Sequence, residues 1–307
     1  MAGRILVTGA AGFVGMHLLP ILAKAMPHAT ISASRFDVTD RIALRAAIRA
    51  ERPDACVHLA AVSAVPAAQS DPDAAWRVNL HGTLDLARTL LEETPDCTLL
   101  FASTADAYGR SFQGGAALDE SAPLAPMNVY GATKAAADLA LGAMVPQGLR
   151  VIRVRPFNHT GPGQSGAFVV AAFARQIARI AAGLQPPVLH VGALDPQRDF
   201  LDVRDVCAAY ACCLARADSL PPGAILNVAS GIVRRVGDVL DSLLTIAGVK
   251  AQIEVDTTRL RPSEIPIASG DAAVARRLLD WTPRIAWETT LADVLKDWRG
   301  RVSTETG

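Results

Sequence analysis

The stretch "RILVTGAAGFVGMHLLPILA", residues 4–23, contains the strongest structural signal in the chain. A short apolar run from Ile5 to Val7 precedes three glycines at every third position, and leucines at helical spacing follow. This order predicts a buried strand, a tight turn and a helix. Backbone N–H groups of such a turn lie at the helix N-terminus, where they can bind a pyrophosphate. The stretch therefore predicts a dinucleotide site at the start of the chain.

The alternation of strands and helices continues beyond this stretch. Apolar runs predict further strands at residues 29–34, 54–62, 97–103 and 149–158. Helical periodicity predicts helices at residues 40–51, 73–93 and 128–144. The apolar stripe expected on the helix 73–93 consists of Trp76, Leu80, Leu84, Ala87 and Leu91. Strands that alternate with helices predict an α/β fold with a doubly wound parallel Rossmann sheet.

From about residue 158 the chain is richer in proline and glycine, which indicates a smaller α/β lobe with more loops. We expect a dinucleotide-binding lobe over residues 1–157, with a return segment at about 199–229. An interleaved substrate lobe is expected over residues 158–198 and 230–307. Ligands should bind in the crevice beyond the carboxyl ends of the strands.

The bulk composition argues against several kinds of partner. The 307 residues carry 30 basic and 30 acidic side chains, and 50% are apolar, so neither nucleic acid nor an anionic membrane is expected. No signal peptide or membrane-spanning stretch is visible, and five cysteines without a C-x-x-C pair indicate reduced thiols. We therefore expect a cytoplasmic enzyme. Because the six histidines lack metal-ligand spacing, we expect no metal.

The residues after the second predicted strand indicate which dinucleotide binds. The acidic residue that reads the ribose of NAD, expected about 20 residues after the glycine turn, is missing. Ser34 and Arg35 stand there instead, and this pair suits a 2′-phosphate, which favours NADPH over NADH. The alternative is that Arg35 is a solvated loop residue. Asp37 is expected either to meet the adenine amino group or to cap the helix that starts near Asp40.

A tyrosine and a lysine form the core of the predicted catalytic site. Tyr130 and Lys134 lie four residues apart on a predicted helix and therefore share a face. A nearby ammonium lowers the pKa of a phenol, which would make Tyr130 an acid or base near neutral pH. Thr104, 26 positions earlier, supplies a hydroxyl at the end of a predicted strand.

Asp106 follows Thr104 by two residues, and in a strand-like segment both side chains would point the same way. The carboxylate either orients the substrate or the local loop, or it transfers a proton in an elimination of water. We favour the orienting role.

Seven segments occur in order along the chain: "TGAAGFVG", "DACVHLAA", "VNLHGT", "STADAYG", "YGATK", "RPFNHTGPGQ" and "NVASG". Over nearly its whole length the chain thereby resembles the extended short-chain dehydrogenases/reductases. The resemblance implies that Thr104, Tyr130 and Lys134 are the catalytic residues and that Asn79 supports the active-site helix. It also implies a homodimer through a four-helix interface formed by the helix 73–93 and the helix of Tyr130.

The cofactor site implied by these motifs draws on four places in the chain. Its expected residues are Gly9, Gly12, Phe13, Val14 and Gly15; Ser34, Arg35, Asp37 and Val38; Leu59, Ala60 and Ala61; and Tyr130 and Lys134.

The second half, with "RPFNHTGPGQ", "QRDFLDVRDV" and "RLRPSE", is similar to the GDP-4-keto-6-deoxy-D-mannose reductases. The similarity implies NADPH-dependent reduction of the C4 ketone of a GDP-linked 4-keto-6-deoxy sugar to GDP-D-rhamnose, or to its epimer GDP-6-deoxy-D-talose. The residues it implies for substrate binding are Asn158, Arg198, Arg261 and Glu264. Guanidinium groups suit a diphosphate, and a carboxylate suits a ribose diol.

Some of these residues also allow a structural interpretation. Arg198 and Arg261 could instead form surface ion pairs, with Asp199, Asp202 or Asp271 as the partners. His159, beside a proline–glycine loop, is expected to be a hydrogen-bonded structural residue. Trp281 is expected in the core.

Two other functions stay open. The first is a GDP-mannose 4,6-dehydratase or another nucleotide-sugar epimerase or dehydratase; the dehydratases carry Thr-x-Glu where this chain has Thr104 and Asp106. The resembling reductases also have an acid there, so Asp106 does not indicate a dehydratase. The second is a non-catalytic NADP-sensing protein, which would need only the glycine turn and not Tyr130 and Lys134.

Overall fold

A computed structural model describes residues 3–256 and 265–304 of the chain. Its centre is a six-stranded sheet with the strand order β2-β1-β3-β4-β5-β9, in which every pairing is parallel. The strands are β1 Arg4–Thr8, β2 Thr30–Ser32, β3 Ala55–His58, β4 Thr98–Ala102, β5 Val151–Pro156 and β9 Ile225–Val228. The predicted doubly wound parallel sheet is confirmed.

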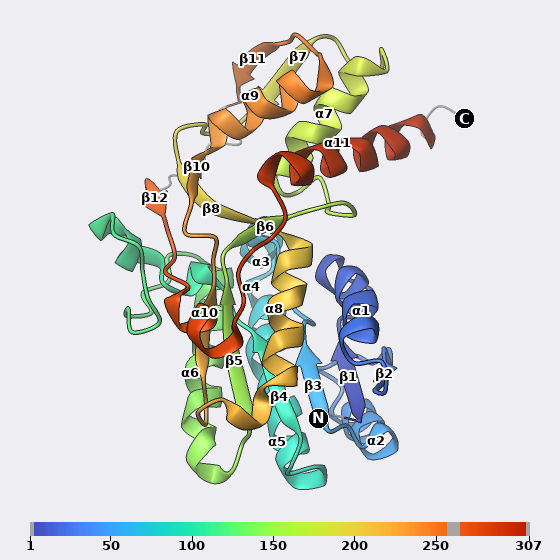
Figure 1. The fold of residues 1–307 in the computed structure, drawn as a ribbon, viewed down its shortest axis with the longest axis vertical. Helices are drawn as coiled ribbons and strands as arrows, with labels where there is room; N and C mark the ends of the chain where they lie inside the picture. Colours follow the sequence, from blue (N-terminus) through green and yellow to red (C-terminus); the bar gives the residue numbers. More distant parts are fainter. Residues whose placement is uncertain (1–2, 257–264, 305–307) are drawn as a thin grey trace.

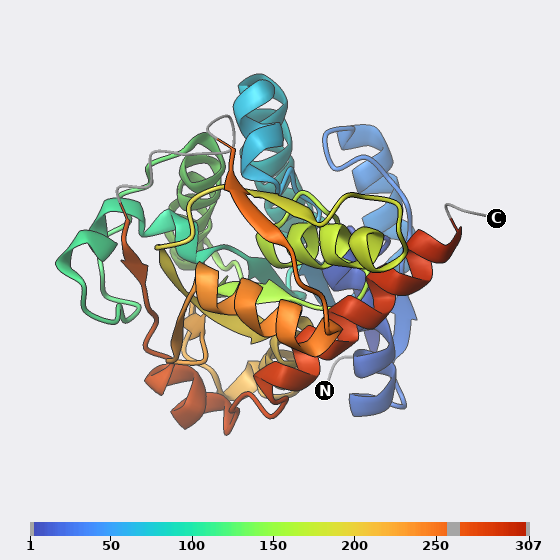
Figure 2. The ribbon, with the colours of Figure 1, turned by 90° about the horizontal axis from the view of Figure 1, so that it is seen from above.

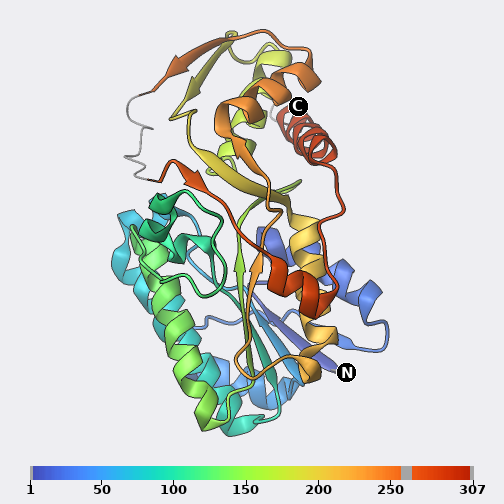
Figure 3. The ribbon, with the colours of Figure 1, turned by 60° about the vertical axis from the view of Figure 1, so that its left-hand side comes forward.

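Helices cover both faces of this sheet (Figures 1 and 3). On one face lie α1 Phe13–Ala25, α8 Val203–Ala215 and α10 Ala273–Leu279, and on the other lie α2 Arg41–Glu51, α5 Thr83–Glu93 and α6 Val129–Met144. Successive strand residues point to opposite faces, so Ile5 and Val7 pack with Leu18 of α1 while Leu6 packs with Leu44 of α2. A sheet buried on both faces explains why its strands are continuous apolar runs.

The helical segment at 73–93 differs from the prediction. It consists of α4 Pro72–Trp76, a π-helical turn η1 Arg77–Gly82 and α5. Only Ala87 of the predicted stripe is fully buried, whereas Ala75, Asn79, Leu86 and Leu90 face the core. The π turn contains one more residue per turn than an α-helix. Positions predicted with 3.6 residues per turn therefore no longer coincide with the buried face after this turn.

A second group of elements packs above the carboxyl ends of the strands (Figure 1). The helices α7 Val169–Ala181, α9 Val236–Ala247 and α11 Trp287–Thr304 share one apolar core and lie against one another (Figure 2). Two small sheets complete this part: β7 Val188–Val191 with β11 Gln252–Val255, and β8 Gln197–Asp202 with β6 Asn158–Thr160, β10 Val233–Arg235 and β12 Ile267–Ala268. The core of the large sheet also takes in residues beyond 230, because Ala268, Ala275 and Trp281 belong to it.

The cysteines and the helix lengths can be compared with the expected reduced thiols and the expected lack of a membrane-spanning stretch. All five cysteines are free thiols, and four of them are buried, which fits their use as core residues. Across the described ranges, every helix is either too short or too polar to cross a membrane.

Candidate active site

The glycine turn between β1 and α1 leaves no room for side chains. Gly9 has a φ of 69°, and a Cβ atom on it would lie 2.6 Å from the backbone nitrogen of Ala60. A Cβ on Gly15 would lie 2.3 Å from the carbonyl oxygen of Ala10. Gly12 begins α1 without a capping side chain, so N–H groups of the first turn, at Phe13 and Val14, have no side-chain acceptor. An exposed turn of this kind fits a pyrophosphate.

The chain after β2 follows the strand that pairs with β1, which leads into the glycine turn. Arg35 is exposed and, within the described residues, makes no hydrogen bond or ion pair. The hydroxyl of Ser34 donates to the carboxylate of Glu51 over 2.5 Å and contacts the hydroxyl of Ser32. Arg35 is therefore a cation that a 2′-phosphate could pair with, and Ser34 is already held by Glu51, a neighbour that the sequence pattern did not indicate.

Asp37 does not cap the helix α2. Its carboxylate accepts hydrogen bonds from the backbone and the hydroxyl of Thr39, both over 2.8 Å, and these bonds lower its pKa. Asp40 is the cap instead, accepting from the backbone N–H groups of Ile42 and Ala43. The capping alternative for Asp37 is therefore wrong. Val38 beside it is buried against Gly82.

The structure brings Thr104 and Tyr130 together, although they lie 26 positions apart. Thr104 lies two residues beyond the end of β4 in an extended conformation, and its hydroxyl accepts from the backbone N–H of Asp106 over 3.2 Å. Tyr130 lies in the first turn of α6, which is capped by the side chain of Asn128. The hydroxyl of Thr104 lies close enough to the phenol of Tyr130 to act on its pKa, which it lowers. Both groups therefore stand at the carboxyl ends of the parallel strands.

Burial decides the ionisation of the tyrosine and the lysine. The pKa of Tyr130 is raised, first by burial and then by the negative charge of Asp106. Burial lowers the pKa of Lys134 to about 7, with the charge of Asp138 acting the other way. In the free protein the pKa of Tyr130 is therefore shifted upward and not downward as predicted, because loss of solvent and the charge of Asp106 both raise it.

Lys134 is held in a dry setting beneath the crevice. It is 3% exposed, and its ammonium lies 4.2 Å from the ring centroid of Phe101. His58 lies nearby, bonded on one side to the hydroxyl of Thr8 over 2.7 Å and on the other to that of Thr83 over 2.9 Å. Burial and the charge of Lys134 lower the pKa of His58 to about 3. His58 is therefore neutral, and the sequence pattern did not reveal it.

Two further buried side chains hold α6 in place. The amide of Asn79 donates to the hydroxyl of Thr133 over 2.9 Å, so the predicted support of the active-site helix is confirmed. Asp138, also on α6, accepts two 3.0 Å hydrogen bonds from Arg155 and one of 3.3 Å from Arg153. This ion cluster ties α6 to β5 and was not found from the sequence, because no local motif links its members.

Asp106 lies in a 3-10 turn, η2 Ala105–Ala107, and not in a strand. The strand-based argument for its direction is therefore wrong. Its charge nevertheless acts on the crevice: it raises the pKa of Tyr130, and it opposes the lowering by burial of the pKa of Arg198. The carboxylate consequently stands close to both the predicted proton donor and a predicted substrate residue.

The predicted substrate residues enter from β6 and β8, which pair in parallel. Asn158 is exposed, and Arg198 is half-buried with a guanidinium that donates to the carbonyl of Gln197 over 2.7 Å. Arg261 and Glu264 lie outside the described residues.

The three acids considered as surface partners of Arg198 are bound elsewhere. Asp199 accepts from Ser230 and Gly231, Asp202 from Arg204 and Thr290, and Asp271 from the backbone of Ala273. The predicted pairing of Arg198 with one of these three acids is therefore wrong.

His159 and Trp281 are structural, as predicted. The imidazole of His159 bonds to the carbonyl of Phe157 over 2.9 Å and stacks on Phe13 with ring centroids 6.2 Å apart. Trp281 is 4% exposed and donates to the carbonyl of Asp205.

Comparisons with known proteins agree with this geometry. Residues 5–229 match the model of the NAD dependent epimerase/dehydratase family. The chain is 39% identical to GDP-6-deoxy-D-mannose reductase of Pseudomonas aeruginosa, over 99% of this chain and 100% of the relative. It is 28% identical to GDP-6-deoxy-D-talose 4-dehydrogenase of Aggregatibacter actinomycetemcomitans, over 87% of this chain and 88% of that one.

Solved structures show the same likeness. The structure of RMD from Pseudomonas aeruginosa complexed with NADPH has a TM-score of 0.89 and 37% identity, covering 97% of this chain and 99% of that one. UDP-glucose 4-epimerase of Thermus thermophilus, in complex with NAD, has a TM-score of 0.83 and 26% identity. The match covers 97% of this chain and 99% of the epimerase chain. The chain belongs to the NAD dependent epimerase/dehydratase family, and its predicted place among the extended short-chain dehydrogenases/reductases is confirmed.

Proposed function

We propose that the protein uses NADPH to reduce the C4 ketone of GDP-4-keto-6-deoxy-D-mannose to GDP-D-rhamnose. The observation that carries this proposal is the 39% identity to a GDP-6-deoxy-D-mannose reductase over 99% of the chain. The neighbouring hydroxyls of Thr104 and Tyr130, with Lys134 on the same helix, support it as a set suited to carbonyl reduction.

The chain's own residues fit the cofactor. The open glycine turn and the N-terminal amides of α1 suit the pyrophosphate, and the exposed guanidinium of Arg35 suits the 2′-phosphate. When bound, the reduced nicotinamide supplies the hydride. The residues Leu59, Ala60 and Ala61 follow β3 beside Gly9, and in this proposal the dinucleotide crosses the sheet edge there.

Tyr130 acts as the proton donor in this proposal. Its raised pKa keeps the phenol protonated, which is the form needed to transfer a proton to the C4 oxygen as negative charge develops there. The hydroxyl of Thr104 holds the phenol and shares the hydrogen bond to the same oxygen. Lys134 in its ammonium form stabilises the phenolate left behind, and Asp106 orients the substrate together with Arg198.

A spectrophotometric assay of NADPH oxidation with purified GDP-4-keto-6-deoxy-D-mannose tests the proposal, with the product configuration read by NMR. We expect rapid oxidation and GDP-D-rhamnose. If the product is GDP-6-deoxy-D-talose, the proposed C4 configuration is wrong and the proposed ketone reduction stands. The similarity to a GDP-6-deoxy-D-talose 4-dehydrogenase would agree with that result. Incubation with GDP-mannose alone separates the dehydratase alternative: formation of a 4-keto sugar there would contradict a reductase.

We also propose a homodimer formed by α4–α5 and α6. Leu139 on α6 is 60% exposed, and Trp76, Leu80 and Leu84 are only half-buried, which leaves an apolar surface along these helices. Light scattering at micromolar concentration should give a dimer mass, and a monomer alone would contradict the proposal.

A further inference from the structure

The loop 161–168, which joins β6 to α7, packs against the first two turns of α1. The ring of Phe13 in the first turn stacks on the imidazole of His159 in β6, with ring centroids 6.2 Å apart. One helical turn further along α1, the imidazole of His17 bonds to the carbonyl of Pro162 in the loop over 2.7 Å. The start of α1, which carries the amides of the dinucleotide turn, is therefore in contact with β6 and with this loop.

The loop is also bonded to the strand that precedes it. Gln164 is 4% exposed, and its side-chain oxygen accepts from the hydroxyl of Thr160 over 2.6 Å. Its side-chain nitrogen donates to the carbonyl of His159 over 3.0 Å. Gly163 has a φ of 91°, a conformation that favours glycine. Because these bonds hold the loop in one shape, we expect a contact on one side of it to affect the other side.

The C-terminal helix α11 contacts the same loop, which lies between α1 and α11 (Figure 1). The carboxylate of Asp297 accepts from the backbone N–H of Gly163 over 3.0 Å. It also pairs over 2.8 Å with Arg301, one turn further along the helix. The guanidinium of Arg301 donates to the carbonyl of Gln164 over 3.3 Å. Two backbone groups of the loop are therefore bonded to charged side chains of α11.

The contact between Asp297 and the loop is made by an anchored helix. Leu291 and Leu295 of α11 are almost completely buried in the apolar core that α11 shares with α7 and α9. The side chains of Asp297 and Arg301 are 25% and 35% exposed, so solvent competes only in part for their hydrogen bonds. A hydrogen bond to a carboxylate is stronger than one between neutral groups. The helix can therefore hold the loop in place.

We infer that Asp297 is a positioning residue for the dinucleotide, because it holds the loop 161–168 against the start of α1. The amides of Phe13 and Val14, which fit a pyrophosphate, lie in the turn that is fixed in this way. Donors that are in place before binding lose less conformational freedom when the ligand arrives, so a fixed turn binds more tightly than a loose one. The inference rests on the dinucleotide site of the proposed function and not on the identity of the sugar.

Fluorescence titration with NADPH, without any sugar nucleotide, tests this role. Asp297→Ala removes the acceptor for the N–H of Gly163, and we expect it to weaken NADPH binding about three- to tenfold, the range that corresponds to one net hydrogen bond. Asp297→Asn keeps an oxygen that can accept from Gly163. It should therefore recover NADPH binding to within about twofold of the wild type.

Asp293→Ala is the matched control. Asp293 lies one turn earlier on α11, is 34% exposed and pairs with Arg204 of α8 over 2.8 Å. Arg204 keeps its bonds to Asp202 when this partner is lost. The variant removes an ion pair of similar exposure from the same helix, but the pair does not involve the loop 161–168. NADPH affinity should therefore equal that of the wild type.

A double-mutant cycle shows whether the contacts on α1 and on α11 act through the same loop. His17→Ala removes the bond to Pro162 and should also weaken NADPH binding about three- to tenfold. Because loss of either contact frees the loop, the variant that combines His17→Ala with Asp297→Ala should bind NADPH about as weakly as each single variant. Independent contacts would give losses that multiply.

Three results would overturn the inference: an unchanged NADPH affinity in Asp297→Ala, an equal loss of affinity in Asp293→Ala, or multiplied losses in the double variant. Failure of the wild type to oxidise NADPH with the keto sugar would instead contradict the proposed function. The role of Asp297 would still stand in that case, because it is measured by NADPH binding alone.

Discussion

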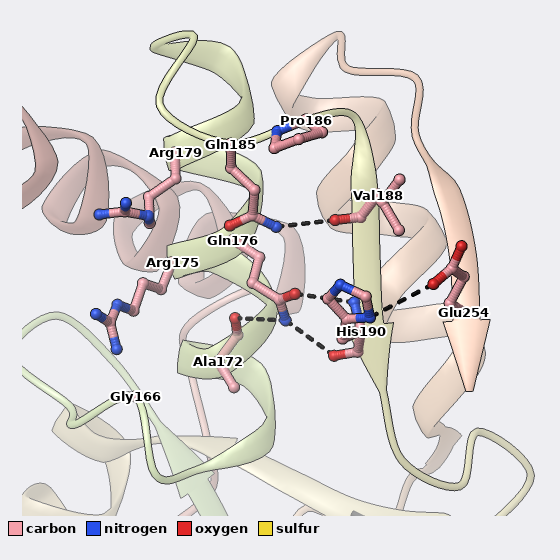
Figure 4. Close-up of a pocket in the computed structure, with 10 residues that line it drawn as sticks. All are labelled: Gly166, Ala172, Arg175, Gln176, Arg179, Gln185, Pro186, Val188, His190 and Glu254. Atoms are coloured by element: carbon pink, nitrogen blue, oxygen red, sulfur yellow. Dashed lines mark hydrogen bonds and ion pairs between the residues drawn. The ribbon is translucent and has the colours of Figure 1, made fainter. Parts of the chain in front are cut away.

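The layer beneath the catalytic groups and a pocket of about 700 Å³ between α7 and the β7–β11 pair use polar side chains in opposite ways (Figure 4). Under the crevice, His58, Asn79 and Asp138 are buried, and each has fixed hydrogen-bond partners. In the pocket, His190 and Glu254 are about half exposed. Desolvation in the first region shifts the pKa of Lys134 to about 7, whereas the two side chains of the second region keep their contact with solvent.

Because the polar groups are buried in one region and half exposed in the other, we expect them to contribute differently to folding and to ligand binding. Buried and bonded groups keep the reacting side chains in place and set their ionisation, so changing them should affect folding or the chemical step. Exposed groups contribute little to folding, so changing them should alter which ligand binds. Substitutions in both regions test whether buried and exposed polar groups differ in this way.

The largest effect is expected for Asp138→Asn. Asp138 is fully buried and binds Arg155, which is 3% exposed, as well as the partly buried Arg153, so its loss leaves both guanidinium groups without their counter-charge. Urea unfolding should show a loss of about 3–5 kcal/mol in the free energy of unfolding. The control is Asp195→Asn, whose partner is the exposed Arg235, and it should leave the midpoint unchanged. Equal losses of unfolding free energy in the two variants would show that burial does not make the Asp138 ion pairs more important for stability than the exposed pair.

Tyr130→Phe should abolish most of the activity without unfolding the protein. The variant keeps the ring and its packing but removes the proton donor, so kcat should fall at least about a hundredfold in the NADPH oxidation assay. NADPH affinity, measured by fluorescence titration, should remain close to that of the wild type. Retention of more than a tenth of kcat would show that another group protonates the C4 oxygen.

Arg35→Ala tests an exposed residue that is expected to act through the ligand alone. We expect NADPH binding to weaken by one to two orders of magnitude, about 1.5–3 kcal/mol for a charge-assisted contact, and NADH binding to change little. Titration of both cofactors on the same protein preparations provides the measurement. Equal weakening of the two would mean that Arg35 supports the local fold and does not read the 2′-phosphate.

The smallest effect is expected for Asp106→Asn. Its charge raises the pKa of Tyr130, but neither hydride transfer nor protonation by Tyr130 needs the carboxylate, so reduction of the keto sugar should persist within about tenfold. Because the negative charge is lost, the pKa of Tyr130 should fall, and the alkaline limb of the pH–rate profile should move to lower pH. An unchanged alkaline limb would contradict the electrostatic link between the two residues.

Much of the fold was predictable because its signals are local. The glycine turn, the apolar strands and the Tyr130–Lys134 helix each depend on residues within a few positions of one another, and strands that alternate with helices leave few topologies. The helix 73–93 shows the limit, since the π turn at Arg77–Gly82 is set by packing and displaced the predicted stripe.

The parallel sheet, the dinucleotide turn, the family and the residues proposed for catalysis could all be predicted from the sequence alone, because local spacing and recurring motifs carry that information. Only the tertiary structure decided the ionisation of the site. The raised pKa of Tyr130, the lowered pKa of Lys134 and the neutral His58 follow from burial and from charges on other elements. The Asp138 cluster, the pair of His190 and Glu254 and the contact of Asp297 with Gly163 likewise join residues far apart in the chain. Desolvation and long-range contacts exist only once the chain has packed, and for that reason no local pattern could reveal them.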